Sequence, residues 1–73
     1  MENKPLSALN HLENGGSVLV IAPAVLSSVF YVERGCIYST NAEIGPYRHE
    51  SKSNIYLHFA EIIDQGGELV NIY

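Results

Sequence analysis

The stretch HLENGGSVLVI, residues 11–21, leads from a helix-like segment through a Gly-Gly pair into an apolar, β-branched run. The same order returns near the end of the chain as IIDQGGELVNI, residues 62–72. Glycine suits such a junction because a helix that ends in a tight reversal needs positive φ just past its last turn. Both stretches therefore predict a helix that stops at the glycines and a strand that follows at once. Convergence on this common connection and an internal duplication both explain the repeat.

The first junction is flanked by a predicted helix over residues 5–14 and a predicted strand over residues 17–22. Pro5 suits a first helical turn, and leucines at helical spacing give the helix one apolar face. The strand segment, SVLVIA, is apolar on both faces, which is typical of a central strand, and the proline after it stops the pairing.

Residues 23–35, PAVLSSVFYVERG, fit two interpretations. A proline in the first turn and a glycine at the end would suit a helix. Against a helix, the run VFYV is β-branched and aromatic, and two adjacent serines interrupt the segment. We favour a loop up to Ser28, a strand over residues 29–33, a turn at Arg34-Gly35 and a strand over residues 36–40.

Residues 54–65 predict the second helix, because Ile55, Phe59 and Ile62 fall on one face of it. Ser53 is the expected N-cap, since a serine hydroxyl accepts a hydrogen bond from the first helical turn. The second Gly-Gly pair ends this helix, and the last strand is expected over residues 68–72.

These segments predict an α+β fold of order α-β-β-β-α-β in a single domain over residues 1–73. Both helices are expected on one face of a four-stranded, mostly antiparallel or mixed sheet. The third strand, the second helix and the last strand are expected to form a right-handed parallel crossover. Because the strands do not alternate cleanly between apolar and polar residues, we expect the uncovered sheet face to be partly apolar and to bind a partner.

Length and cysteine content favour self-association. A 73-residue chain buries only about 60% of its unfolded surface, and small chains usually gain support from disulfides, a metal or oligomerisation. The single cysteine, Cys36, excludes an intramolecular disulfide, and no CxxC or paired-histidine spacing indicates a zinc site. We therefore expect a homo-oligomer, with Cys36 as a structural strand residue.

Charge and hydropathy narrow the classes of partner. Eight acidic and four basic residues give a net charge of −4, which disfavours binding to nucleic acid. The uncharged run over residues 14–32 has an apolar part shorter than the roughly 20 residues that a membrane helix needs. The first residues do not resemble a secretory signal. We expect a soluble, cytoplasmic protein with neither a nucleic-acid nor a membrane partner.

The titratable residues do not indicate catalytic chemistry. His11 and His58 lie inside the predicted helices, where they are expected to flank the apolar stripes. Nothing around Cys36 indicates an activated thiol, and the carboxylates show no spacing that sets them apart from solvated charge. We therefore predict no catalytic residue, no metal ligand, no cofactor and no enzymatic activity.

Residues 41–53 predict a loop, with a short edge strand near residues 47–50, and contain the most distinctive cluster of the chain. The segment PYRHESK places an aromatic ring beside cationic side chains, and Tyr and Arg are favoured at binding hot spots. A solvated connection is the alternative interpretation. We predict that a partner or ligand contacts this loop and the preceding turn through Tyr47, Arg48, His49 and Arg34.

The function that these features favour is that of a small, acidic, non-enzymatic protein-interaction module. It is expected to bind itself and a further protein partner, as accessory or inhibitor proteins of phages and mobile elements do. The alternative is a protein that binds a small anionic or nucleotide-like ligand between its subunits, around Arg48 and His49.

Overall fold

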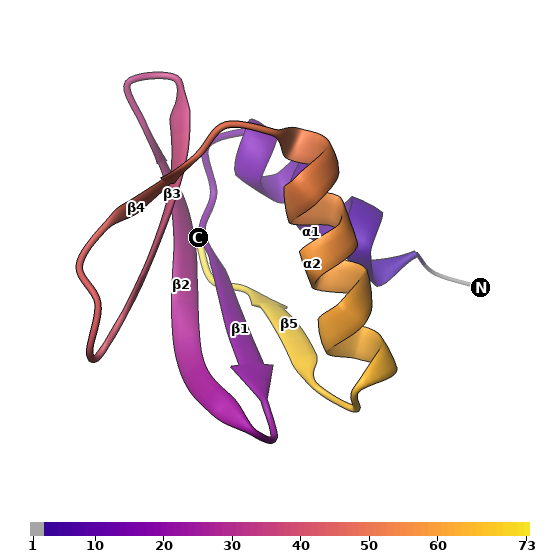
Figure 1. Cartoon of the computed structure of the whole chain (residues 1–73). Coiled ribbons are helices and arrows are strands. Elements are labelled where there is room, and N and C mark those ends of the chain that lie inside the picture. Colours follow the sequence, from indigo (N-terminus) through magenta and orange to yellow (C-terminus); the bar gives the residue numbers. More distant parts are fainter. Residues whose placement is uncertain (1–2) are drawn as a thin grey trace.

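The computed structural model describes residues 3–73, which form two helices and five strands (Figure 1). Their order is α-β-β-β-β-α-β. The elements are α1 (Lys4–Glu13), β1 (Val18–Ala22), β2 (Val25–Glu33), β3 (Cys36–Asn41), β4 (Tyr47–His49), α2 (Lys52–Asp64) and β5 (Glu68–Asn71).

The strands form one antiparallel sheet in the spatial order β4-β3-β2-β1-β5. The predicted α+β class and the placement of both helices on one face are confirmed. The sheet has five strands and not four, because the short edge strand near residues 47–50 is a full member, β4.

The predicted parallel crossover is wrong. β5 pairs antiparallel with β1, and Leu19 lies opposite Val70. Both edges of β3 are already occupied, by β2 and β4, so β5 cannot pair with β3 and lies on the free edge of β1 instead. The polar connection before α2 therefore decides the topology, because it forms a strand of its own.

The ambiguous segment after β1 is extended, as favoured from the sequence, but β2 begins at Val25 and not at Val29. Pairing with β1 extends it, since Ser28 lies opposite Val20 and Val25 opposite Ala22. At its other end, Arg34 and Gly35 have φ of 52° and 77°. Two consecutive positive φ values are the signature of a tight hairpin turn whose twist matches that of the strands.

The end of α1 shows why its glycines are needed. Gly15 has a φ of 89°, and its N–H donates to Leu12 O at 2.9 Å, while the N–H of Gly16 donates to His11 O at 2.9 Å. This pair of bonds is the Schellman arrangement, which satisfies helix carbonyls that have no partner within the helix.

α2 ends in the same way, with Gly66 at a φ of 82° and the Gly67 N–H donating to Ile62 O at 2.8 Å. The second glycine meets a further constraint here. A Cβ on Gly67 would lie 2.5 Å from Ile21 O and 2.7 Å from Ile62 Cγ2. The backbone that leaves α2 thus passes directly against β1, at a distance that only glycine permits.

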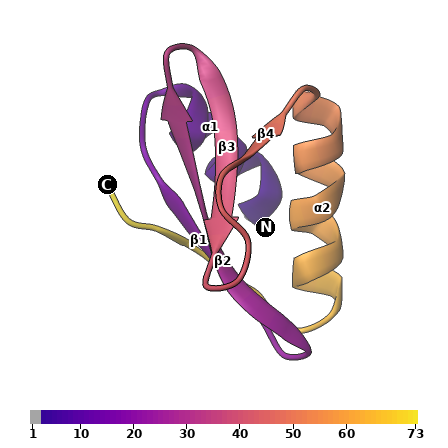
Figure 2. The same cartoon turned by 60° about the vertical axis from the view of Figure 1, so that its left-hand side comes forward.

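α2 begins two residues earlier than expected. Its N-cap is Ser51 and not Ser53, and the Ser51 hydroxyl accepts a hydrogen bond from the Asn54 N–H at 3.3 Å. β4 ends at His49, so the chain passes almost directly from the edge strand into the first turn of α2 (Figure 2).

The core lies between the helices and the central strands. Eleven apolar side chains form it, with α1 and α2 packed over β1, β2 and β5: Ala8, Leu9, Leu12, Val18, Val20, Ala22, Phe30, Ile37, Ile55, Phe59 and Ile62. Phe30 from β2 meets Phe59 from α2 edge to face, with ring centroids 5.0 Å apart. Neither helix in residues 3–73 has the length and apolar character that a membrane crossing requires.

The glycine geometry yields a ranked stability prediction. Gly15→Ala and Gly66→Ala each place a Cβ at positive φ and should lower the free energy of unfolding by about 1 kcal/mol. Gly67→Ala should cost more, because its Cβ meets the β1 backbone. Gly45→Ala is the control, since a Cβ there meets open space. Chemical denaturation measures all four, and an unchanged stability of Gly67→Ala would contradict the close approach.

Candidate functional site: a groove and an open sheet face

A groove lies between β4 and α2, on the helix side of the sheet. It consists of two adjoining hollows of about 640 and 440 Å³ that share His49 and His58 among their lining residues. Volumes of roughly 300–1,000 Å³ are usual for ligand sites. The groove exists because the helices pack over the β1, β2 and β5 side of the sheet and leave the β3–β4 side uncovered.

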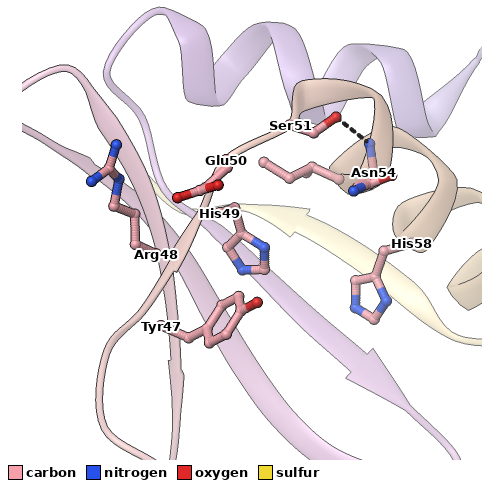
Figure 3. Close-up of a pocket in the computed structure, with 8 residues that line it drawn as sticks. Tyr47, Arg48, His49, Glu50, Ser51, Asn54 and His58 are labelled. Atoms are coloured by element: carbon pink, nitrogen blue, oxygen red, sulfur yellow. Dashed lines mark hydrogen bonds between the residues drawn. The ribbon is translucent and has the colours of Figure 1, made fainter.

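Strand alternation in β4 divides the predicted binding tripeptide between two faces. Tyr47 and His49 lie opposite Ser39 and Ile37 of β3, and both point to the helix side. Arg48 lies opposite Tyr38, on the other side of the sheet. Figure 3 shows the Arg48 side chain directed away from the groove, whereas the rings of Tyr47 and His49 are directed toward His58.

The fourth predicted residue, Arg34, lies in the β2–β3 turn and is exposed. It lines neither hollow of the groove. The structure therefore brings Tyr47 and His49 together in one site and places Arg34 outside it. Arg48 borders the groove, but its side chain points to the opposite side of the sheet.

His49 is the most constrained side chain of the groove. Its Nε2 shares a hydrogen bond with Ser39 Oγ at 2.7 Å, and its ring stacks on Phe30 with centroids 5.0 Å apart. The ring of Tyr47 meets it edge-on, also at 5.0 Å. Burial, and secondarily the nearby His58, lowers the pKa of His49 below its ordinary value of 6.5. This imidazole is therefore neutral at pH 7.

Three residues of the groove did not stand out in the sequence: Ser39, Phe30 and His58. His58 is exposed on α2, with its ring centroid 5.9 Å from that of Phe30. The expectation that it flanks the apolar stripe holds, since Ile55 and Ile62 line the groove beside it. In the sequence, the alternation of the strand that contains Phe30 and the helical spacing between His58 and Ile62 indicate which side chains share a face. The pairing of β3 with β4 was still needed to bring these residues together.

The Ser39–His49 bond has the length of a nucleophile–base pair, yet the third member of such a site is absent from the described residues. A catalytic base is normally oriented by a further polar group. Ser39 is the one hydrogen-bond partner of the His49 side chain in residues 3–73. In the same part of the chain, no group of three or more His, Cys, Asp or Glu side chains is arranged to hold a metal ion.

The second candidate surface is the sheet face opposite the helices, here called the open sheet face. Because Val18, Val20 and Phe30 point into the core, the alternate side chains of the same strands lie on this face. Its centre is apolar and aromatic, and the residues that form it are Leu19, Val29, Tyr31, Tyr38 and Val70. Tyr31 and Tyr38 lie opposite each other and stack, with centroids 5.7 Å apart. Cys36 is half-buried at the edge of this face, opposite Glu33.

Comparisons with protein-family models, with curated proteins and with solved structures found no match for this chain.

The lowered pKa of His49 makes the stability of the fold depend on pH. The unfolded chain protonates this side chain near its ordinary pKa of 6.5, whereas the folded chain does so only at lower pH. The free energy of unfolding should therefore fall as the pH drops through 6.5, and this decline should end below the folded pKa.

Denaturation curves between about pH 7.5 and 5 measure this decline. His49→Gln should flatten it, because a glutamine side chain does not titrate in this range. Equal slopes in the parent and in His49→Gln would show that His49 titrates alike in the folded and unfolded chains.

Proposed function

We propose that this chain is a non-enzymatic protein-interaction module that self-associates through the open sheet face. The observation that carries the proposal is the uncovered apolar centre of that face. Leu19, Tyr31 and Tyr38 project from central strands, where no element among residues 3–73 packs on them. Charged side chains, among them Glu33 and Arg48, lie around this centre.

The composition of the open sheet face suits a protein interface. Interfaces between proteins have an apolar core enriched in aromatic side chains and a polar rim. Tyrosine contributes there because its large, rigid ring loses little conformational entropy on contact. A symmetric pair of copies would place the two stacked tyrosine pairs toward the centre of one continuous apolar layer.

A dimer formed in this way would still present the helix layers of both copies. We propose that the assembled module acts by covering or bridging the surface of a further protein, in the manner of an accessory or inhibitor protein. Binding of a small anionic ligand between subunits is the second candidate function. It rests on Arg48, which lies beside Tyr38 on the face that association would bury.

Light scattering combined with size exclusion tests the association. The parent chain should have about twice the monomer mass of 8.1 kDa at micromolar concentration. Leu19→Lys places an ammonium group in the centre of the open sheet face and should return the mass to that of the monomer, with an unchanged circular dichroism spectrum. Leu57→Lys is the matched control, because Leu57 is exposed on α2.

A parent chain that remains monomeric over a wide range of dilution would contradict self-association. Affinity capture from the native host then tests the wider function, with the parent, Leu19→Lys and Leu57→Lys compared side by side. A protein captured equally by all three variants would not depend on the open sheet face.

A further inference from the structure

Four rings line the groove, those of Phe30, Tyr47, His49 and His58. The ring of Phe30 forms part of the floor, with His49 stacked at 5.0 Å and His58 at 5.9 Å, centroid to centroid. Tyr47 stands beside His49 and is 62% exposed, so one of its faces is free for a ligand. Aromatic faces carry negative electrostatic potential and attract organic cations, most strongly where water is partly excluded.

The charges around the groove have the sign that a cation requires. Glu43 of the β3–β4 connection lines one hollow, and Glu50, which follows β4, lines the other. Arg48 is the one Lys or Arg among the lining residues, and its side chain points to the opposite side of the sheet (Figure 3). Lys52, in the first turn of α2, pairs with Glu13 of α1 at 3.6 Å.

The neutral imidazole of His49 completes this environment. His49 is uncharged at pH 7 because burial disfavours its protonated form. It therefore offers a ring face and a hydrogen-bonding nitrogen without repelling a cation. The lining residues from β1, β2 and β3 carry no titratable group, so the charge at this site is set by β4, α2 and the β3–β4 connection.

The inner half of the groove is apolar. Val20, Phe30 and Ile62 form its buried base, and exposed apolar side chains border it. Those side chains are Val25, Leu26 and Ile44, with exposed fractions of 60%, 47% and 63%. Burial of methylene groups on such a surface is favourable by about 0.8 kcal/mol for each group. The groove can therefore hold an aliphatic stem as well as a charged end.

We propose that the groove binds a basic segment of a partner protein, with a Lys or Arg side chain seated against Tyr47, His49 and His58 and its neighbouring apolar residues against Phe30 and Ile62. This site lies within one subunit and on the face opposite the one assigned to self-association. The two surfaces can be occupied together, and a dimer presents two such grooves. The groove thus supplies the contact through which the module bridges or covers its partner.

The same geometry argues against an anionic ligand inside the groove. The alternative drawn from the sequence had Arg48 and His49 act together as donors, and alternation in β4 separates them. No Lys or Arg side chain among the lining residues points into the groove, and a carboxylate lines each of its hollows. Peptides with a cationic and with an anionic side chain should therefore differ in their affinity for the groove.

Three capped pentapeptides of the form Ala-Leu-X-Leu-Ala serve as probes, with X as lysine, norleucine or glutamate. Norleucine keeps the aliphatic stem of lysine and removes its charge. Each peptide is titrated into the full chain, and amide and ring signals are followed by NMR. The lysine peptide should bind about three- to tenfold more tightly than the norleucine peptide, and the glutamate peptide more weakly than both. The shifted signals should cluster at Tyr47, His49 and His58.

Variants locate the contact. Tyr47→Ala should reduce affinity for the lysine peptide about three- to tenfold and leave the norleucine peptide closer to its parent value. The matched control is Tyr73→Ala, because Tyr73 is the most exposed tyrosine at 88% and does not line the groove. Leu19→Lys should leave peptide binding unchanged, so failure of self-association and failure of this proposal are separate outcomes.

The pH dependence of binding provides an independent criterion. Protonation of His49, whose pKa burial holds below the ordinary value of 6.5, adds positive charge to the groove, so affinity for the lysine peptide should fall as the pH drops through that range. Any of four results would overturn the proposal. They are tighter binding of the glutamate peptide, affinity for lysine that rises at low pH, equal affinity for lysine and norleucine, and an absence of shifts at millimolar peptide.

Discussion

The ring of Phe30 is the contact on which the two layers of the molecule and its groove all depend. It is 2% exposed in the middle of β2. One of its neighbours is Phe59 of α2, met edge to face, and another is His49 of β4, met in a stack. A single aromatic side chain therefore joins the centre of the sheet to the helix above it and to the edge strand beside it. The core and the groove share this residue, so the floor of the groove is as rigid as the core itself.

A second constraint follows from the short connection between β4 and α2. The edge strand ends at His49 and the helix begins at Lys52. With so few residues between them, the start of α2 lies close to the end of β4. The rest of α2 packs over β1 and β5, away from β4 on the same face of the sheet. The opening between them becomes the groove. Tyr47 and His49 line it because they are the alternate residues of β4 that face the helices.

The sheet presents its faces more readily than its edges. The two edge strands have three and four residues, which leaves little unpaired backbone for another strand. The wide surfaces are the open sheet face, with its tyrosine pair, and the groove on the other side. The open sheet face is aromatic and aliphatic, whereas the groove is lined by rings and carboxylates. The two surfaces therefore favour different occupants.

The sequence by itself determined the local structure, because that structure depends on neighbouring residues. Helix ends at Gly15 and Gly66, the turn at Arg34-Gly35 and the strand character of residues 29–33 follow from backbone preferences and periodicity. The tripeptide at residues 47–49 could also be singled out, because its composition is unusual in an acidic chain. The predicted starts of α2 and β2 were wrong, because a competing serine caps the helix and pairing with β1 extends the strand.

Only the tertiary structure decided which side chains act together. The place of β5 beside β1 depended on which strand edges remained free, a property of the whole sheet. The separation of Arg48 from Tyr47 and His49 required that their segment be a strand, since alternation sends neighbours to opposite faces. Ser39, Phe30 and His58 joined the groove from three other elements, at sequence separations that local patterns cannot relate. Long-range packing, which no single segment encodes, made a groove from residues that separately resemble ordinary strand and helix positions.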